Sequence, residues 1–324
     1  MRMFRTIGCA VLLVFSAGPA SAQNYPAAKP IKIIVSTSPG GVTDLAARIL
    51  GQHITAKTGQ TVVIDNRAGA SGNIAMDGLA KSEPDGYTLG VANTGNIVIN
   101  PYLFPAMPYD PLKDLAPVGL LGTVPLFLVM NSNVPAKSLA EFIAYTRDNP
   151  DKISYASAGA GTTPDIAAHE FARRSGLKLV MVPFRGTGPA TQAVLGGDVH
   201  ATFVSMGPHI EFVRQGKLLV LGAATPQRVP YLPDTPTFAE QGFPGFETST
   251  WFAVFAPRGT PQAVVDQVNG YVRGMTEDPD LKRRLEANFV TLTPMTQPDF
   301  AAMVKTDAAK WEHIVRQNNI KLEQ

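Results

Sequence analysis

Two glycine-rich stretches each follow a short apolar run and precede a helical pattern. They read "STSPGGVTD" (36–44) and "SAGAGTTPD" (157–165). The first turn of a helix has unpaired N–H groups and a partial positive charge, so it favours a carboxylate or phosphate. Glycines let a ligand approach the backbone, and nearby hydroxyls add donors. We therefore predict a ligand held between the two loops by Thr37, Ser38, Gly40, Gly41, Ser157, Gly161, Thr162 and Thr163.

The two stretches do not match the known nucleotide-binding motifs. A Walker loop ends in Gly-Lys-Ser/Thr, and neither stretch has the lysine. A dinucleotide fingerprint needs a third glycine where the second stretch has Pro164. The ligand is therefore expected to be an anion other than a nucleotide. For either loop alone, a tight strand-to-helix turn without function remains the alternative.

Four further residues join the predicted ligand site. Thr94 in "VANTGN" and Ser205 in "FVSMG" each lie at or just after the end of a predicted strand, where ligands of α/β sheets collect. Arg185 in "VPFRGTGPA" could bind a carboxylate through two hydrogen bonds, or pair with a surface neighbour. Asp165 could either cap its helix or face the ligand. Asp44, at the matching place in the first loop, is interpreted as a capping carboxylate.

A secreted α/β hydrolase acting on a small carboxylate is the alternative function, with Ser157 or Ser205 as its nucleophile. The segment around Ser205 has Phe203 where a nucleophile elbow needs glycine. None of the five histidines forms H-x-H or H-E-x-x-H, and none lies beside either serine in the sequence. We therefore expect no catalytic residue, no metal site and no cofactor. A purely structural module fits two anion-binding loops poorly.

The N-terminus reads as a cleavable signal peptide over 1–22. Arg2 and Arg5 precede an apolar run, and Ala20-Ser21-Ala22 forms a small-x-small cleavage site. The apolar run is shorter than the roughly 20 residues that a spanning helix needs. We therefore expect secretion to the periplasm. Cys9, the only cysteine, lies within the signal, so the remaining chain would fold without disulfides.

The charge balance argues against nucleic-acid and anionic-membrane partners. The chain of 324 residues has a formal net charge of +2, and Arg2 and Arg5 account for it. No run of basic residues occurs in the rest of the chain. A neutral surface lacks the positive field that such partners require.

The elements that must position these residues alternate along the chain. Short apolar runs such as 31–35, 61–64 and 87–92 read as strands, and helical patterns lie between them. This alternation predicts an α/β fold with mainly parallel sheets flanked by helices. Strand, glycine-rich turn and helix occur at 31–57 and again at 152–175, which indicates two lobes. Helical patterns at 260–275 and 297–319 are expected to pack back onto an existing lobe.

The ordered set of motifs resembles the Bug family, the extracytoplasmic solute-binding proteins of tripartite tricarboxylate transporters. The likeness covers essentially the whole chain after the signal peptide. It rests on these segments: "KPIKIIVSTSPGGVTDLAARILGQHI", "VVIDNRAGASGNIA", "PDGYTL", "DLAPVGLL", "ISYASAGAGTT", "VPFRGTGPATQAVLGGDV", "LPDTPTFAEQGFPGFE" and "FAPRGTP".

The resemblance implies a two-lobed periplasmic-binding-protein fold, type II-like, with a hinge of two crossing strands. Lobe 1 would comprise 23–124 and 249–324, and lobe 2 would be inserted as 125–248. The ligand would be a di- or tricarboxylate, an acidic amino acid, a nicotinate-like compound or an aromatic acid. The receptor, expected to be a monomer, would pass it to permease subunits of the transporter or to a sensor.

Three departures from the family pattern affect the site. The chain has Ser36-Thr37 where the family often has Pro-Phe or Pro-Tyr, and Thr163-Pro164-Asp165 where it often has Pro-Ser-His. It has Val204 where an aspartate is common. A carboxylate at position 165 would repel an anionic ligand. We therefore expect Asp165 to face solvent, or to meet an amino or ring-nitrogen group of the ligand.

Overall fold

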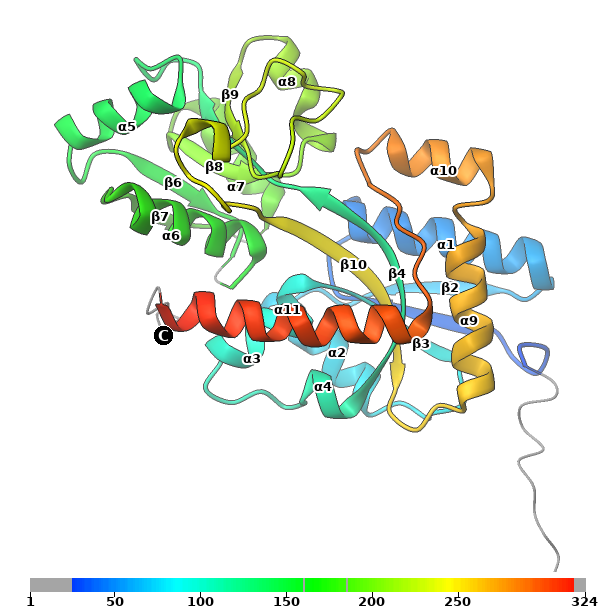
Figure 1. Cartoon of the computed structure of the whole chain (residues 1–324). Helices are drawn as coiled ribbons and strands as arrows, with labels where there is room; N and C mark the ends of the chain where they lie inside the picture. Colours follow the sequence, from blue (N-terminus) through cyan, green and yellow to red (C-terminus); the bar gives the residue numbers. More distant parts are fainter. Residues whose placement is uncertain (1–24, 160, 185, 318–324) are drawn as a thin grey trace, which may run out of the picture.

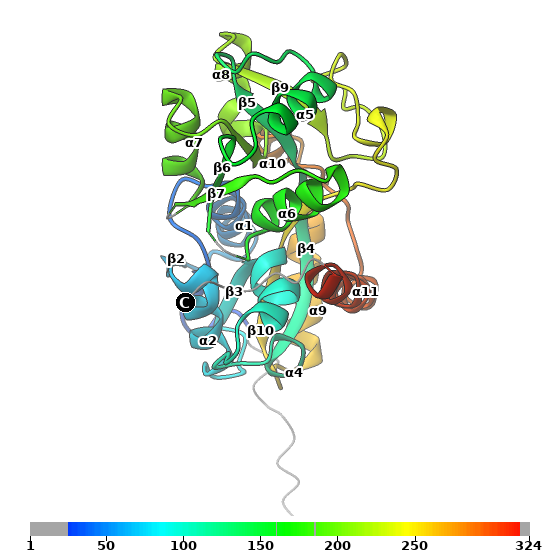
Figure 2. The ribbon, with the colours of Figure 1, turned by 90° about the vertical axis from the view of Figure 1, so that its left-hand side faces the viewer.

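The computed structural model describes residues 25–317 except 160 and 185, so the predicted signal peptide lies outside the described residues. Two five-stranded sheets, each with helices packed on it, form two lobes that lie one above the other (Figures 1 and 2). We call the part built on the first sheet lobe 1 and the other part lobe 2. The chain boundaries at 125 and 248 remain a prediction.

The sheet of lobe 1 has the strand order β2-β1-β3-β10-β4. β1 pairs in parallel with β2 and β3, whereas β10 runs antiparallel to both β3 and β4. Its strands are β1 (Ile31–Val35), β2 (Val62–Asn66), β3 (Thr88–Asn93), β4 (Leu115–Pro125) and β10 (Ser249–Pro257). Its helices are α1 (Val42–Thr58), η1 (Ala70–Gly72), α2 (Asn73–Ala80), η2 (Gly95–Ile99), α3 (Asn100–Leu103), α4 (Pro111–Asp114), α9 (Gln262–Gly274), α10 (Pro279–Glu286) and α11 (Gln297–Gln317).

The sheet of lobe 2 has the order β7-β6-β8-β5-β9. β6 pairs in parallel with β7 and β8, and β5 runs antiparallel to β8 and β9. Its strands are β5 (Phe127–Asn131), β6 (Ser154–Ser157), β7 (Val180–Pro183), β8 (Ala201–Val204) and β9 (Leu218–Ala223). Its helices are α5 (Leu139–Asp148), α6 (Thr163–Ser175), α7 (Thr187–Gly196), η3 (Gly207–His209), α8 (Ile210–Arg214) and η4 (Ala239–Gln241).

The predicted two-lobed α/β fold is confirmed, and one strand of each sheet runs against the others, which makes both sheets mixed. β10, which returns from lobe 2, is inserted between β3 and β4 and runs against both. β5, which carries the chain into lobe 2, likewise runs against its two neighbours. In each sheet, one strand next to the passage between the lobes is therefore antiparallel to both of its neighbours.

Two crossing strands join the lobes. β4 and β10 pair along their whole length, from Leu115↔Pro257 to Pro125↔Ser249. Directly beyond this ladder, the Leu126 N–H donates to the Thr248 carbonyl oxygen at 3.1 Å. Lobe motion must therefore act through this short two-stranded passage, as the family resemblance implies for a hinge.

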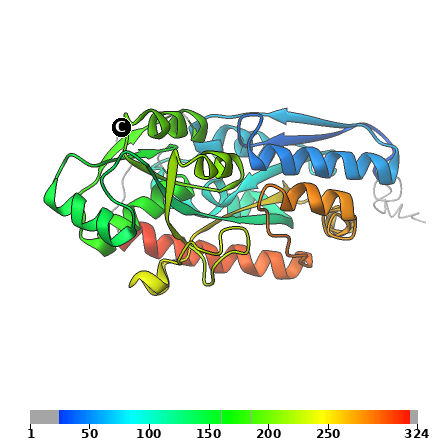
Figure 3. The ribbon, with the colours of Figure 1, turned by 90° about the horizontal axis from the view of Figure 1, so that it is seen from above.

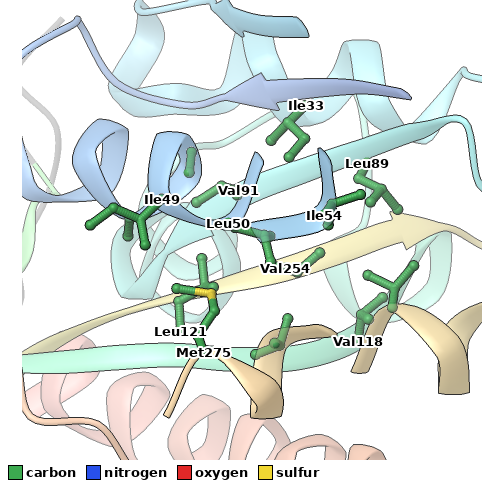
Figure 4. Close-up of a cluster of buried hydrophobic side chains, with 14 of the residues drawn as sticks. Ile33, Ile49, Leu50, Ile54, Leu89, Val91, Val118, Leu121, Val254 and Met275 are labelled. Carbon is green, nitrogen blue, oxygen red and sulfur yellow. The ribbon is translucent and has the colours of Figure 1, made fainter. Parts of the chain in front are cut away.

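Apolar clusters cover both faces of the lobe 1 sheet. On one face, Ile49, Leu50 and Ile54 of α1 pack with strand residues such as Ile33 and Val91 (Figure 4). On the other face, α2, η2 and α11 contribute to a second cluster. Figure 3 shows α11 lying along one side of the molecule. The C-terminal helices thus pack back onto lobe 1, as the sequence predicts.

Two helices begin in different ways. Ser138 caps α5 by accepting the Glu141 N–H at 3.2 Å. At the start of α9, Pro261 occupies the cap position, and the Thr260 hydroxyl donates to the Pro257 carbonyl instead of capping the helix. Across the described residues, no helix has the length and apolar character needed to cross a membrane.

Candidate functional site

The loops at the carboxyl ends of β3 and β6 meet between the lobes. A methyl group added at Gly95 would lie 3.4 Å from the Gly161 carbonyl oxygen. One added at Gly161 would lie 2.8 Å from Leu103 Cδ1 and 3.2 Å from Asn100 Oδ1. Glycine at both positions therefore permits a close approach between lobe 1 and the N-terminal loop of α6. The two lobes are in contact at this point.

The first glycine-rich loop is organised by Asp44. Its carboxylate accepts hydrogen bonds from the Gly40 N–H at 3.0 Å, Arg48 Nε at 2.9 Å and Asn66 Nδ2 at 2.9 Å. Burial of the carboxyl opposes its ionisation, but the hydrogen bonds from Arg48, Gly40 and Asn66 outweigh this effect and hold the pKa of Asp44 below its usual value. Asp44 thus stabilises the loop, in line with the capping interpretation.

The second loop repeats this arrangement. Asp165 accepts the Gly161 N–H at 3.1 Å and the Tyr155 hydroxyl at 3.2 Å. In each loop, a carboxylate in the first turn therefore binds the N–H of the glycine four residues earlier. The expectation that Asp165 faces solvent is wrong, because this residue is only 1% exposed. The capping interpretation accounts for its position, and contact with a ligand nitrogen stays a prediction.

Because of these hydrogen bonds, two of the predicted glycines cannot offer a free N–H group to a ligand. The N–H groups of Gly40 and Gly161 donate to aspartates of their own loops. Both residues have positive φ, 90° and 78°, which glycine adopts without strain. Gly41 differs: it caps α1 in an extended conformation, with no side-chain hydrogen bond at the cap and open space around its α-carbon. Of these glycines, Gly41 is best placed to let a ligand approach a helix N-terminus.

The predicted hydroxyl groups fall into two sets. Thr94, Ser157 and Thr162 have protein partners: Trp251 N–H donates to Thr94 Oγ1, Gly159 N–H donates to Ser157 Oγ, and Thr162 Oγ1 donates to the Gly159 carbonyl.

The other set consists of Ser36, Thr37 and Ser38 at the first loop and Thr163 at the start of α6. Ser36 Oγ and Thr37 Oγ1 are buried, and neither has a hydrogen-bond partner among the described residues. Ser38 is exposed, whereas Thr163 is buried as the first residue of α6. The two hydroxyls that differ from the family pattern are therefore the ones left to bind a water or a ligand.

Ser205 lies directly after β8 and is half-buried. Its carbonyl oxygen lies 2.6 Å from His209 Nδ1, and His209 Nε2 lies 2.7 Å from Thr191 Oγ1. Burial lowers the pKa of His209, although the bond to the Ser205 carbonyl opposes this shift. The neutral ring therefore donates from Nδ1 to the backbone of Ser205. This bond holds the loop after β8, and it joins His209 to the backbone of Ser205 rather than to its hydroxyl.

A group of asparagines beside the loop after β3 was not predicted. Asn100 Nδ2 donates to Asn73 Oδ1 at 2.7 Å, and Asn96 Nδ2 donates to the Ser71 carbonyl. Ser71 lies in a turn whose backbone is left-handed from 69 to 72. The sequence signal was "GASGN", because two glycines flanking small residues favour such a turn. The predicted site residue Arg185 lies outside the described residues.

Comparison with known proteins connects this geometry to a family. The model of the "Tripartite tricarboxylate transporter family receptor" matches residues 46–320. Protein BugT of Bordetella pertussis is 35% identical over 322 residues, which cover 99% of this chain and 98% of BugT.

Two solved structures share the fold. R. palustris Rpa4515 with adipate has a TM-score of 0.87 and 31% identity, covering 92% of this chain and all of that chain. MatC from Rhodopseudomonas palustris with bound malate has a TM-score of 0.83 and 32% identity, covering 89% and 99%. Sequence and fold agree over nearly the whole length, and the chain therefore belongs to the family of tripartite tricarboxylate transporter receptors.

Proposed function

We propose that this receptor captures a small carboxylate between its lobes in the periplasm and delivers it to the permease subunits of a tripartite tricarboxylate transporter. The observation that carries the proposal is the pair of matching loops, one from each lobe, that precede α1 and α6. Each contains a glycine N–H bound by a carboxylate four residues later. The α6 loop also touches the other lobe at Gly95. A carboxylate between such helix N-termini gains both hydrogen bonds and a favourable field.

We assign the lobe 1 side of the site to Thr37, Ser38, Gly40, Gly41 and Thr94. Ser36 and Thr37 support this assignment, because their buried hydroxyl oxygens have no partner among the described residues. An ordered water between these hydroxyls and a ligand oxygen would satisfy both groups. The lobe 2 side is assigned to Ser157, Gly161, Thr162, Thr163, Asp165, Arg185 and Ser205.

The ligand class is proposed from the relatives and from the chemistry of the loops. Adipate and malate, the compounds in the two relatives' structures, are both dicarboxylates. A dicarboxylate has two anionic ends, and two helix N-termini, one in each lobe, offer one place for each. Acidic amino acids and nicotinate-like or aromatic acids remain within the proposed class.

Ligand capture would act through the crossing strands. A ligand that touches both loops makes contacts in the closed arrangement that it lacks when the lobes are apart. This difference in affinity shifts the population toward closure. A closed receptor presents both lobes in one fixed orientation, which a permease can distinguish from the ligand-free protein. We propose a monomeric receptor without catalytic activity.

A thermal-shift screen tests the proposal. The secreted chain would be mixed with malate, adipate, acidic amino acids, nicotinate and aromatic acids, with matched neutral amides as controls. A ligand at 100 times its Kd should stabilise the folded state by about 2.7 kcal/mol. Stabilisation by a carboxylate but not by its amide is the expected result. If no compound raises the melting temperature and one of them is turned over, the receptor function is wrong and the hydrolase alternative gains support.

A further inference from the structure

Phe289 follows α10, a helix of lobe 1, but its ring packs against lobe 2. The ring centroid lies 4.0 Å from that of Tyr231, with 35° between the ring planes. Both rings border the lobe 2 cluster that contains Phe127 and Val204. The next residue, Val290, is 2% exposed and belongs to a lobe 1 cluster. The side chains of two consecutive residues thus pack against different lobes.

The residues after Phe289 are fixed to the crossing strand β4. Thr291 N–H donates to the Thr123 carbonyl at 2.8 Å, and Thr123 N–H donates to the Thr291 carbonyl at 2.9 Å. A methyl group added at Gly122 would lie 2.4 Å from Val290 Cγ1, so the two segments are closely packed. The backbone next to Phe289 is therefore fixed to lobe 1. Because its ring packs against lobe 2, a movement of lobe 2 relative to lobe 1 must break or shift this contact.

The backbone before Phe289 also touches lobe 2. A methyl group added at Gly207 would lie 3.1 Å from the Asn288 carbonyl oxygen. Gly207 begins η3, two residues after Ser205 in the candidate site. The contact formed by Asn288 and Phe289 is therefore connected through a short loop to the predicted ligand-binding residues of lobe 2.

Two unfavourable features occur at this contact. Phe289 has a φ of 57°, in the left-handed region that is unfavourable for an L-residue with a side chain. The Tyr231 hydroxyl is buried without a hydrogen-bond partner in the described part of the chain. Such costs persist when surrounding structure imposes them, and they gather where conformation matters to function. A role in lobe orientation would explain why an aromatic residue occupies position 289.

A second contact between the lobes lies at α6. Ile166 of α6 is fully buried in a lobe 1 cluster that also contains Trp251 of β10. Figure 1 shows α6 and the α10–α11 connection on opposite sides of the crossing strands. Two contacts on either side of a hinge constrain its bending and twisting more than either contact alone.

We propose that the Phe289–Tyr231 contact sets the angle between the lobes and holds the receptor in the arrangement in which Gly95 touches the α6 loop. Phe289 acts as a positioning residue: it contacts no ligand in the proposed site and works through the lobe arrangement. Without its ring, lobe 2 loses an aromatic contact with lobe 1 that lies outside the crossing strands. The lobes then sample a wider range of angles.

Spin labels on the two lobes test this proposal without any ligand. The only cysteine, Cys9, precedes the predicted cleavage site, so the secreted chain offers a cysteine-free background. Lys57 of α1 and Gln215 after α8 are exposed and suit labelling as Lys57→Cys and Gln215→Cys. Pulsed electron paramagnetic resonance would then give the distribution of distances between the lobes.

Phe289→Gly is the decisive variant, since it removes the ring and also relieves the backbone strain. We expect a broader distance distribution with a new population away from the wild-type maximum, and little change in melting temperature. Tyr231→Leu should act in the same way, and the double variant should add little to either single variant. Leu292→Ala is the matched control, because this partly buried side chain packs on a lobe 1 cluster.

The outcomes are distinct. An unchanged distribution in Phe289→Gly, or equal broadening in Leu292→Ala, overturns the proposal. A narrower distribution would also overturn it, because the contact would then drive the lobes away from this arrangement. Since no ligand takes part, failure of the carboxylate screen would leave this measurement valid, and the two proposals can fail separately.

Discussion

Asp44 and Asp165 occupy equivalent places in the two lobes: each carboxylate accepts the N–H of the glycine four residues before it, at 3.0 Å and 3.1 Å. In each loop, at least one backbone N–H group is therefore already bonded within the protein. Each carries an internal carboxylate that fixes the loop and occupies one N–H group. The N–H groups of the first helical turn remain for a ligand.

Replacing Asp44 should destabilise lobe 1 in a pH-dependent way. Asp44→Ala should lower the free energy of unfolding by about 1–3 kcal/mol, because hydrogen bonds to a charged group are lost. The folded-state pKa lies below the unfolded value, so this stability is present above about pH 4 and is lost as the pH falls through the folded pKa. Urea unfolding between pH 3 and 7 would measure it.

Asp44→Asn is the control for the charge, since it keeps a side-chain acceptor for the Gly40 N–H. Its stability should depend less on pH than that of the wild type over the acidic range. Equal pH dependence in Asp44→Asn and the wild type would contradict the role given to the ionised carboxylate.

The sequence pattern predicted where the glycine-rich loops lie along the chain, but it did not predict which residues they contact. "IKIIVSTSPGGVTD" combines a β-branched run, two glycines and a helical pattern, and it folds as β1, turn and α1. The short helices η2 and α3 were not predicted, because the asparagines that hold them bond to residues more than 20 positions away. The burial of Asp165 depends on Tyr155, and a sequence pattern gives no direction for that side chain.

The contact between the lobes was beyond prediction for the same reason. Phe289 and Tyr231 are separated by 58 positions, and neither lies in a motif. Their meeting depends on how two lobes are placed about β4 and β10. Family resemblance predicts two lobes and a hinge, but not which side chains touch across it.

His209 should contribute a second pH dependence near neutrality. Burial places its folded-state pKa below the unfolded value of about 6.5. The neutral ring is therefore the stable folded form, and stability is lost as the pH falls below 6.5 toward the folded pKa. His209→Gln should flatten the wild-type stability profile between pH 5 and 7, as measured by thermal unfolding.

Other histidines also affect the pH dependence of stability, so the wild type must be compared with the His209→Gln variant. Burial also lowers the pKa values of His53 and His200, so they contribute in the same direction. The difference between wild type and His209→Gln isolates one residue. If that difference is constant across pH, His209 does not titrate in this range.

Thr94 should stabilise the junction between the site and the crossing strand β10. Its hydroxyl oxygen accepts the backbone N–H of Trp251 at 2.9 Å, and Thr94 is fully buried. Thr94→Val would leave that N–H unpaired and cost about 1–3 kcal/mol. Thr94→Ser keeps the hydroxyl and should cost less. Urea unfolding followed by tryptophan fluorescence would measure both, and equal losses in the two variants would contradict the assigned bond.

Alanine substitutions at Gly41 and at Gly161 should affect the melting temperature differently, because only Gly161 lies at the contact between the lobes. Gly41 has φ of −82° and open space around it, so Gly41→Ala should fold with a melting temperature within about 2 °C of wild type. Gly161 has φ of 78° and lies near Leu103, so Gly161→Ala should lower the melting temperature by several degrees.

Binding then decides the role of Gly41. A methyl group at the start of α1 should weaken binding of the carboxylate found in the screen at least tenfold, because the ligand could no longer reach the helix N-terminus. Gly270→Ala on α9, which also has open space, is the matched control and should bind as wild type does. Isothermal titration calorimetry gives both affinities. Wild-type affinity in Gly41→Ala would place the ligand away from this loop, even if the receptor function itself holds.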